Sequence, residues 1–245
     1  MESIKEPQLT PALIRERRDK LMVRLRAAAD AAGRDPDGFR LVAVTKGFGV
    51  PVVLAAREAG ITLFGENRVQ EAKPKVEALP EAAWHLVGRL QSNKARRALA
   101  LFAAIHSIDS LELLERLERI AHDDGKHPTV LLQVNLSGEP TKGGFEAAWF
   151  QQEASARREL LTALTGLRRC RLAGLMTMAP AGGDPAEQHA TFARLRELRD
   201  RLEQGIGREL PELSMGMTAD AEAAVAEGAT LVRVGTALFG PRPHA

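Results

Sequence analysis

Short apolar runs alternate with amphipathic segments along almost the whole chain. Eight runs have the length and apolar content of buried strands, and they span residues 39–45, 62–65, 84–87, 104–108, 129–135, 171–176, 212–215 and 231–234. The segments between them have the apolar spacing of helices and span residues 50–59, 67–77, 92–101, 110–121, 146–165, 185–204 and 219–227. Strands that alternate with helices favour a parallel sheet, and eight such units close into a barrel. We therefore predict an α/β fold, a (β/α)8 TIM barrel, with residues 1–245 forming a single domain.

One further helix is expected ahead of the first strand, over residues 11–32. Thr10 is a suitable N-cap, and Pro11 is tolerated at the first helical position. Leu21 and Leu25 fall on one apolar stripe of this segment. The barrel should therefore carry an extra N-terminal helix.

Lys46 stands where the first apolar run ends, directly before Gly47. Desolvation at such a position favours the neutral amine, which is the form that attacks an aldehyde. In a barrel of this kind, chemistry is found at the carboxyl ends of the strands. The other strand ends also carry residues suited to ligand contact, namely Glu66 and Asn67, His85, Ser107, Asn135, Met176, Ser214 and Arg233. This pattern predicts a ligand site at that end of the barrel.

The loops after the seventh and eighth strands have the features of a phosphate site. Gly216 and Gly235 would let the backbone approach an anion closely, and Ser214, Thr218 and Thr236 supply hydroxyls. A short helix is expected to begin near Thr236. Barrel enzymes often bind phosphate with the loops after strands seven and eight.

Strand eight pairs with strand one in a closed barrel, so Lys46 should lie close to this phosphate site. Together they describe a phosphorylated aldehyde held as a Schiff base. Pyridoxal phosphate (PLP) fits, and so does the sugar-phosphate substrate of a Schiff-base aldolase. Arg233 favours PLP, because its guanidinium could donate a hydrogen bond to the pyridine nitrogen and keep that nitrogen unprotonated. The ring would then be a poor electron sink.

The residues around this site form blocks that resemble a known family. The blocks are Val44-Thr-Lys46, Phe64-Gly-Glu-Asn67, Trp84 to Lys94, Asn135 to Pro140 with Lys142 and Gly144, Gly174-Leu-Met176, Ser214-Met-Gly-Met217 and Val232-Arg-Val-Gly235. They span roughly residues 41–240 and are similar to the pyridoxal phosphate homeostasis proteins. The resemblance implies a barrel like the N-terminal domain of alanine racemase. It also implies PLP held as an aldimine on Lys46 and a role in vitamin B6 homeostasis without known turnover.

Combined with the strand-end pattern, the resemblance gives a set of expected cofactor contacts. They are Lys46, Asn67, His85, Met176, Ser214, Met215, Gly216, Arg233, Gly235 and Thr236. Two positions depart from the family pattern. Thr218 stands where many members have serine and keeps a hydroxyl, whereas Gly47 stands where a bulkier residue is common and should leave the mouth of the site more open.

The chain contains no tyrosine. The alanine racemases that it resembles use a lysine and a tyrosine from a second domain as their two bases, and this chain has neither that tyrosine nor that domain. His85 is the one obvious substitute, and the loss of a general base costs about 10² to 10⁴ in rate. We therefore expect a PLP carrier or regulator with no catalytic residue, which supplies PLP-dependent apoenzymes. The alternatives are a low-activity amino-acid racemase or Schiff-base lyase, and a barrel that acts only through protein partners.

Composition narrows the remaining classes. The 34 basic and 32 acidic side chains give a net charge of +2, with no basic field for nucleic acid. The lone Cys170 suits a reducing compartment, and neither a signal peptide nor a membrane span is visible. The six histidines show no metal-ligand spacing. We expect a soluble, cytoplasmic monomer without a metal.

Overall fold

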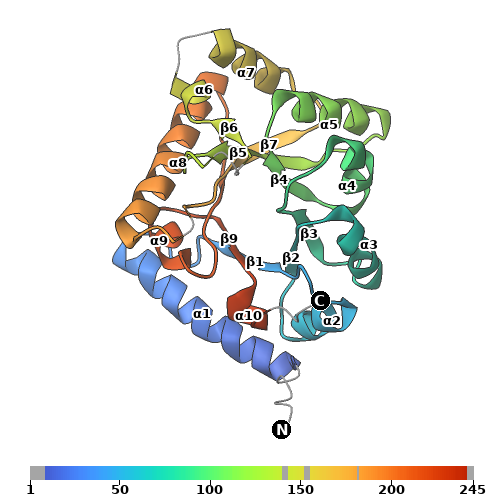
Figure 1. Cartoon of the computed structure of the whole chain (residues 1–245), viewed down its shortest axis with the longest axis vertical. Coiled ribbons are helices and arrows are strands. Elements are labelled where there is room, and N and C mark those ends of the chain that lie inside the picture. The colour runs from blue at the N-terminus through green and yellow to red at the C-terminus, as the bar shows by residue number, and fades with distance from the viewer. Residues whose placement is uncertain (1–8, 140–142, 152–154, 181, 242–245) are drawn as a thin grey trace.

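A computed structural model of the chain describes residues 9–139, 143–151, 155–180 and 182–241. Its strands form a closed parallel ring surrounded by helices (Figure 1). The strands are β1 (Arg40–Val44), β2 (Leu63–Glu66), β3 (Ala83–Leu86), β4 (Ala104–Ile108), β5 (Thr129–Asn135), β6 (Phe145–Glu146), β7 (Arg171–Met176), β8 (Glu212–Ser214) and β9 (Leu231–Val234). All eight predicted strands are therefore present, and β6 is an addition.

Two pairings close the ring. The sheet order is β4-β3-β2-β1-β9-β8-β7-β5-β6, and β4 also pairs with β5. β9 pairs in parallel with β1, with Val232 opposite Leu41 and Val234 opposite Ala43. The predicted (β/α)8 barrel is confirmed, and the end of the last strand lies beside the end of the first.

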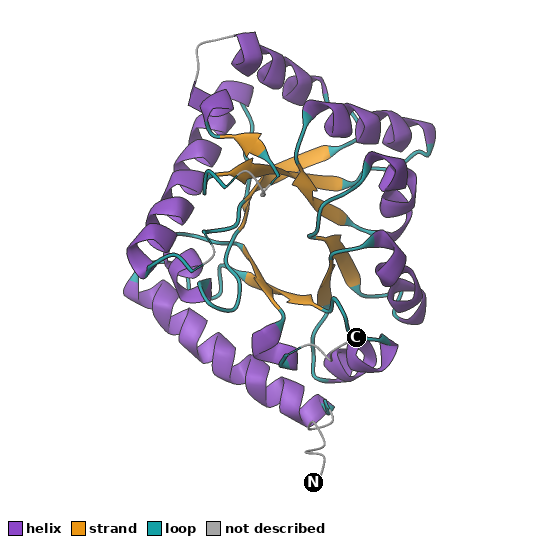
Figure 2. Ribbon diagram, viewed as in Figure 1, coloured by secondary structure: helices purple, strands orange, loops and turns teal. Residues whose placement is uncertain are grey.

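The helices lie outside the ring of strands (Figure 2). They are α1 (Pro11–Ala31), α2 (Val50–Glu58), α3 (Val69–Ala78), α4 (Ala95–Leu101) after a 3₁₀ turn over Ser92–Lys94, α5 (Leu111–Asp123), α6 (Ala148–Gln151), α7 (Ser155–Gly166), α8 (Pro185–Ile206), α9 (Ala221–Ala226) and α10 (Thr236–Phe239). The extra N-terminal helix is confirmed as α1. The Thr10 hydroxyl accepts a hydrogen bond from the Leu13 amide at 3.3 Å and caps it.

The helix predicted over residues 146–165 is wrong as a single element. Phe145 and Glu146 pair with Val134 and Asn135 of β5 as strand β6, and α6 and α7 follow as separate helices. The physical reason is the length of β5, because β4, on the edge that β6 shares, pairs with it only as far as Leu132. The last two residues of β5 would otherwise have an open edge. Pro140 and Lys142, which belong to one of the family-like blocks, lie outside the described residues.

Side chains alternate between the barrel interior and the helical layer, as a period of two requires. Val42, Leu131, Met176 and Leu231 form a small apolar cluster inside the barrel. Their neighbours along the strands, such as Ala43 and Leu175, belong to the larger core between strands and helices. A residue's parity along its strand therefore decides whether it can face a ligand inside the ring.

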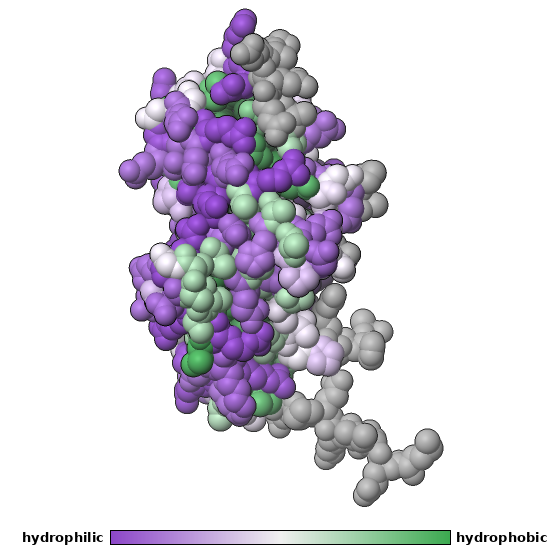
Figure 3. Space-filling view, turned by 90° about the vertical axis from the view of Figure 1, so that its left-hand side faces the viewer, coloured by the Kyte–Doolittle hydropathy of each residue, from purple (hydrophilic) through white to green (hydrophobic). Residues whose placement is uncertain are grey.

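The outer surface on the side of α1, α8 and α9 is mainly hydrophilic, with small apolar groups between polar ones (Figure 3). Val23 of α1 is the most exposed large apolar side chain in the described ranges, at 68%. No helix among the described residues is long and apolar enough to cross a membrane.

Candidate functional site

Lys46 lies on a tight turn at the carboxyl end of β1. The Phe48 amide donates to the Thr45 carbonyl at 3.1 Å, and Gly47 has φ +79°, so residues 45–48 form a turn with glycine at its third position. A positive φ at that position defines a type II turn and is strained for any residue with a Cβ. Gly47 therefore serves the backbone of the lysine-bearing turn, which adds a structural reason to its departure from the family pattern.

The turn is tied to the last helix of the chain. Phe48 is buried and its ring lies 5.5 Å from that of Phe239 in α10, measured between centroids. Since α10 begins directly after β9, this contact joins the Lys46 turn to the loop predicted to bind phosphate. The predicted proximity of the two features is confirmed by the β1–β9 pairing.

The two glycine-containing loops lie side by side at the carboxyl ends of β8 and β9. The Ala237 amide donates to the Thr218 hydroxyl at 3.3 Å, which links them directly. A Cβ on Gly235 would come 3.1 Å from the Val44 carbonyl oxygen, so this position is crowded. Thr236 is exposed, and its amide donates no hydrogen bond within the described part of the chain. Thr236 is thus a donor available to an anion.

Arg233 is buried inside the barrel, with 5% of its surface exposed. Its Nη1 donates to the Ser214 hydroxyl at 2.7 Å and its Nη2 donates to the Thr177 carbonyl at 2.8 Å. Burial lowers the pKa of Arg233 to about 10, partly opposed by the charge of Asp220. The guanidinium remains protonated at neutral pH, and it keeps further N–H groups for a ligand.

Two histidines extend this arrangement across the barrel. The Nδ1 of His106 lies 2.8 Å from the Ser214 hydroxyl, and its Nε2 lies 2.9 Å from Nδ1 of His85. The four side chains come from β3, β4, β8 and β9. They form one hydrogen-bonded chain from His85 to Arg233, which we call the interior chain.

The donor direction along the interior chain follows from the chemistry of arginine. Arg233 can only donate, so the Ser214 oxygen accepts from it. Ser214 is fully buried, and its own hydrogen would lack an acceptor unless it points to Nδ1 of His106. His106 then carries its proton on Nε2 and donates to Nδ1 of His85. His85 therefore carries its proton on the remaining nitrogen, Nε2.

Both histidines are neutral at physiological pH. Burial, with a smaller contribution from Arg40, lowers the pKa of His85 to about 4. Burial also holds the pKa of His106 well below its ordinary value, and the neighbouring His85 and Arg233 act in the same direction. A neutral His85 with hydrogen on Nε2 offers a donor at that nitrogen and no lone pair.

The predicted cofactor contacts differ in whether their side chains point into the barrel or toward the helices. Met176 lies inside the barrel, in the interior apolar cluster. Met215 was predicted as a cofactor contact, but its side chain is fully buried in the core between strands and helices. The reason is parity, because Ser214 precedes it and points inward. The Ser214 hydroxyl, which was predicted to contact the phosphate, makes hydrogen bonds with Arg233 and His106.

Asn67 follows β2 and borders an open pocket of about 570 Å³ at the carboxyl ends of β2 and β3. The pocket is also lined by Arg68, Gln91 and Lys94. In the ranges that the structure describes, neither the Asn67 side chain nor the Lys94 ammonium makes a hydrogen bond or ion pair. Polar groups thus line a pocket after β2, the strand that pairs with the Lys46-bearing β1, although Lys46 is not among its lining residues.

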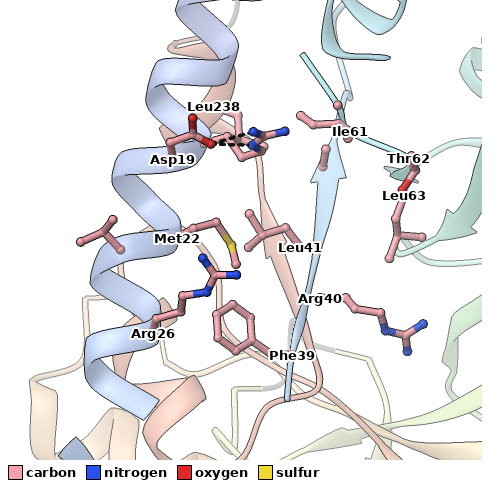
Figure 4. A pocket seen from close by; sticks show the side chains of 14 residues that line it. Asp19, Met22, Arg26, Phe39, Arg40, Leu41, Ile61, Thr62, Leu63 and Leu238 are labelled. Atoms are coloured by element: carbon pink, nitrogen blue, oxygen red, sulfur yellow. Dashed lines mark hydrogen bonds and ion pairs between the residues drawn. The ribbon is translucent and has the colours of Figure 1, made fainter. Parts of the chain in front are cut away.

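A second pocket, of about 490 Å³, lies at the opposite end of the strands (Figure 4). α1 forms one wall with Met22 and Arg26, and the starts of β1 and β2 form the other with Leu41 and Leu63. Lys46 and Arg233 are not among its lining residues. Because the chemistry of such barrels lies at the carboxyl ends, we do not assign this pocket to the ligand site.

Two other expectations concern metals and the lone thiol. Among the described residues, no three His, Cys, Asp or Glu side chains are grouped so that they could hold a metal ion. Cys170 is buried, and burial raises the pKa of its thiol to about 12, with a further contribution from Glu118. Cys170 therefore behaves as a packed side chain.

Sequence reasoning missed His106 and Thr177. The sequence analysis considered His106 only as a metal ligand, and its spacing from the other histidines does not fit a metal site. A usable signal was its place in the middle of the apolar run 104–108, where a polar side chain of inward parity needs a buried partner. The partner itself could not be read from the chain, because Ser214 is 108 residues away.

These features define a parallel barrel with a lysine, a buried arginine and two glycine-containing loops at one end. The family described as "Alanine racemase, N-terminal domain" matches residues 18–243. The pyridoxal phosphate homeostasis protein of Synechocystis sp. is 43% identical over 210 residues, covering 84% of this chain and 93% of that protein. The protein of that name from Pseudomonas aeruginosa is 44% identical over 228 residues, covering 92% and 94%. The chain therefore belongs to the pyridoxal phosphate homeostasis protein family, as its sequence predicted.

Solved structures agree with this assignment. PipY of Synechococcus elongatus PCC7942, solved with PLP bound, has a TM-score of 0.81 and 43% identity, covering 93% of this chain and 100% of that chain. Alanine racemase from Clostridium difficile 630 in complex with cycloserine has a TM-score of 0.69 and 15% identity, covering 91% of this chain and 60% of that chain. The likeness to the racemase shows the fold alone.

Proposed function

We propose that this chain binds PLP at the carboxyl end of its barrel, as a Schiff base with Lys46, and takes part in PLP homeostasis without efficient catalysis. The observation that carries the proposal is the common location of three features. They are the Lys46 turn on β1, the buried Arg233 on the adjacent β9, and the linked loops after β8 and β9. The PLP-bound structure of PipY, at 43% identity, supports it.

The residues present fit the three functional parts of PLP. Lys46 supplies the amine for the aldehyde carbon. Arg233 is a buried, permanently charged donor suited to the pyridine nitrogen. Its hydrogen bonds to Ser214 and Thr177 leave further N–H groups of the guanidinium for this contact. Thr236, beside Gly235, supplies for the phosphate an amide that has no hydrogen-bond partner among the described residues.

PLP supplies, when bound, an electrophilic carbon and a ring that withdraws electrons best when its nitrogen is protonated. Arg233 stays protonated at neutral pH, so it would donate a hydrogen bond to that nitrogen without transferring a proton to it. His85 cannot act as the second base from Nε2, because the interior chain leaves a hydrogen there. Both effects work against proton removal from an amino acid and favour a carrier.

We further propose that the carrier acts as one barrel domain and as a monomer in the cytoplasm, and that it supplies PLP to PLP-dependent apoenzymes. The mainly hydrophilic face in Figure 3 is consistent with the monomer, and the single, buried cysteine of the chain, Cys170, suits a reducing compartment.

The test is a spectrum followed by a map of the modified site. PLP is added to the purified protein, the visible band is recorded, and the sample is reduced with borohydride and digested. We expect a yellow band that disappears on reduction, with the label on Lys46. Lys46→Ala should lose both, whereas Lys20→Ala, at an exposed position on α1, should keep both. A label on another lysine, or no band in the parent protein, would overturn the proposal.

A second candidate is a weak racemase or Schiff-base lyase, which is favoured by the match of residues 18–243 to the family described as "Alanine racemase, N-terminal domain". Alanine racemisation and aldol cleavage are assayed with the PLP-loaded protein. Turnover of about one per second or more is in the ordinary enzyme range and would contradict the proposal that the protein is a carrier.

A further inference from the structure

A buried ion pair lies on the outer side of the barrel, directly behind the Lys46 turn. Glu66, the last residue of β2, is 0% exposed, and Lys75 of α3 is 3% exposed. The Lys75 ammonium donates to the Glu66 carboxylate at 2.6 Å. It also donates to the main-chain carbonyl of Thr45 at 2.7 Å, while the Thr45 hydroxyl donates to the same Glu66 oxygen.

The sequence brings these groups together by strand register and helix spacing. Val44 of β1 is opposite Gly65 of β2, so the next residues, Thr45 and Glu66, also lie side by side. Gly65 faces the interior against Val42, and Glu66 therefore faces the helical layer. Lys75 lies on the same buried stripe of α3 as the apolar residues three and six positions before it.

A buried ion pair such as Glu66 and Lys75 is not an efficient way to stabilise a fold. Burial raises the pKa of Glu66, opposed by its hydrogen bonds from Lys75 and Thr45 and by the charge of Lys75. The second oxygen of Glu66 is buried without a partner among the described residues. Removing charges from water costs several kcal/mol per ion, and apolar side chains of similar volume often stabilise a core as well or better. This arrangement calls for a role beyond packing.

The role follows from the carbonyl that Lys75 binds. The Thr45 oxygen accepts two hydrogen bonds, one from the Phe48 amide that closes the turn and one from the Lys75 ammonium. That carbonyl belongs to the peptide bond that joins Thr45 to Lys46. The Lys75 ammonium therefore fixes the orientation of the peptide plane that precedes Lys46. Glu66 in turn holds the ammonium and the Thr45 side chain in place.

We propose that Lys75 and Glu66 are positioning residues for Lys46, which orient the turn that presents its amine to an aldehyde. The inference rests on the proposed function for its ligand, but its first consequence concerns the protein without PLP. Loss of the Lys75 donor should loosen the turn, and with it the placement of the Lys46 amine.

The experiment compares four forms of the full chain. Lys75→Met removes the donor but leaves Glu66 as a buried unpaired carboxylate, so it should lower the melting temperature strongly. Glu66→Gln combined with Lys75→Met removes both charges and restores most of the melting temperature, still without a donor to Thr45. Lys73→Met is the matched control, because it removes a lysine of the same helix that is 54% exposed and pairs weakly with Glu77.

Two quantities are measured besides melting. One is amide hydrogen exchange of Phe48 in the PLP-free protein, and the other is the apparent Kd for PLP from the visible band. In the double variant we expect Phe48 exchange at least about tenfold faster and a Kd raised about tenfold or more, in line with loss of a hydrogen bond from a charged donor. The control should stay within about twofold of the parent in both.

The outcomes separate the two proposals. A double variant with parental Phe48 exchange and parental Kd would show that the pair only stabilises the fold, and would overturn the positioning role. A parent protein without a PLP band would overturn the proposed function, and faster Phe48 exchange in the double variant would then still show that Lys75 holds the turn. A raised Kd with parental exchange would also overturn the inference, since the turn would not be its cause.

Discussion

The interior chain makes the stability of the protein depend on pH in a specific direction. His85 has a pKa of about 4 in the folded protein, against an ordinary value of 6.5 in the unfolded chain. The unfolded state therefore binds more protons between these values, and the free energy of unfolding rises with pH there. The contribution of neutral His85 to the free energy of unfolding is complete above about pH 6.5 and is lost as the pH falls toward about 4.

The size of the effect follows from those two values. Between about pH 7.5 and pH 5, His85 alone should reduce the free energy of unfolding by about 2 kcal/mol. His106, whose pKa lies well below its ordinary value for the same reason, acts in the same direction. Glu66, with a raised pKa, opposes them in part. Such a loss is a sizeable fraction of the 5–15 kcal/mol typical of a domain.

The assay is urea unfolding at several pH values for the parent and for His85→Asn. An asparagine amide oxygen can accept the hydrogen bond from His106 in place of Nδ1, but it does not titrate in this range. The variant should therefore lose about 2 kcal/mol less than the parent between pH 7.5 and pH 5. His122→Gln, at an exposed position of α5, should lose as much as the parent. Parallel curves for the parent and His85→Asn would refute a neutral, buried His85.

Three further predictions follow from single residues. Gly47→Ala should lower the free energy of unfolding by about 1–2 kcal/mol in urea, because a Cβ is strained at φ +79°. Phe239→Ala should lower it by about 3–5 kcal/mol in the same assay, since the ring is 2% exposed and packs on Phe48. Cys170, with a thiol pKa of about 12, should react with a thiol reagent at pH 8 at least about 100-fold more slowly in the native protein than in urea.

The positions of the main site residues could be predicted because they depend on strand parity and strand order. Lys46 and Arg233 each follow from an apolar run with a polar residue near its carboxyl end. Closure of eight parallel strands then makes β9 the neighbour of β1. The short helix α10 was likewise signalled by Gly235 and Thr236 at the end of β9. These features need no knowledge of side-chain contacts.

The features that were missed depend on pairs of residues distant along the chain. β6 forms because β5 extends beyond its pairing with β4, and the apolar spacing of residues 146–165 contains no information on that register. The burial of the Met215 side chain in the outer core depends on the exact parity of a three-residue strand, which the sequence does not show. Lys75 was visible as a charge on a buried helical stripe, but its partners, Glu66 and the Thr45 carbonyl, belong to other elements.

The interior chain connects the two halves of the proposed function. Arg233 is held in the barrel by Ser214, and because an arginine can only donate, that contact fixes every donor as far as His85. The orientation that suits a pyridine nitrogen therefore also places a hydrogen on Nε2 of His85. A histidine in that state offers no base at Nε2, and its lowered pKa keeps it from serving as an acid near neutrality. Under the proposed function, tight placement of PLP and weak proton transfer would both be consequences of one hydrogen-bonded chain, and a substitution that frees His85 should do so at the expense of Arg233.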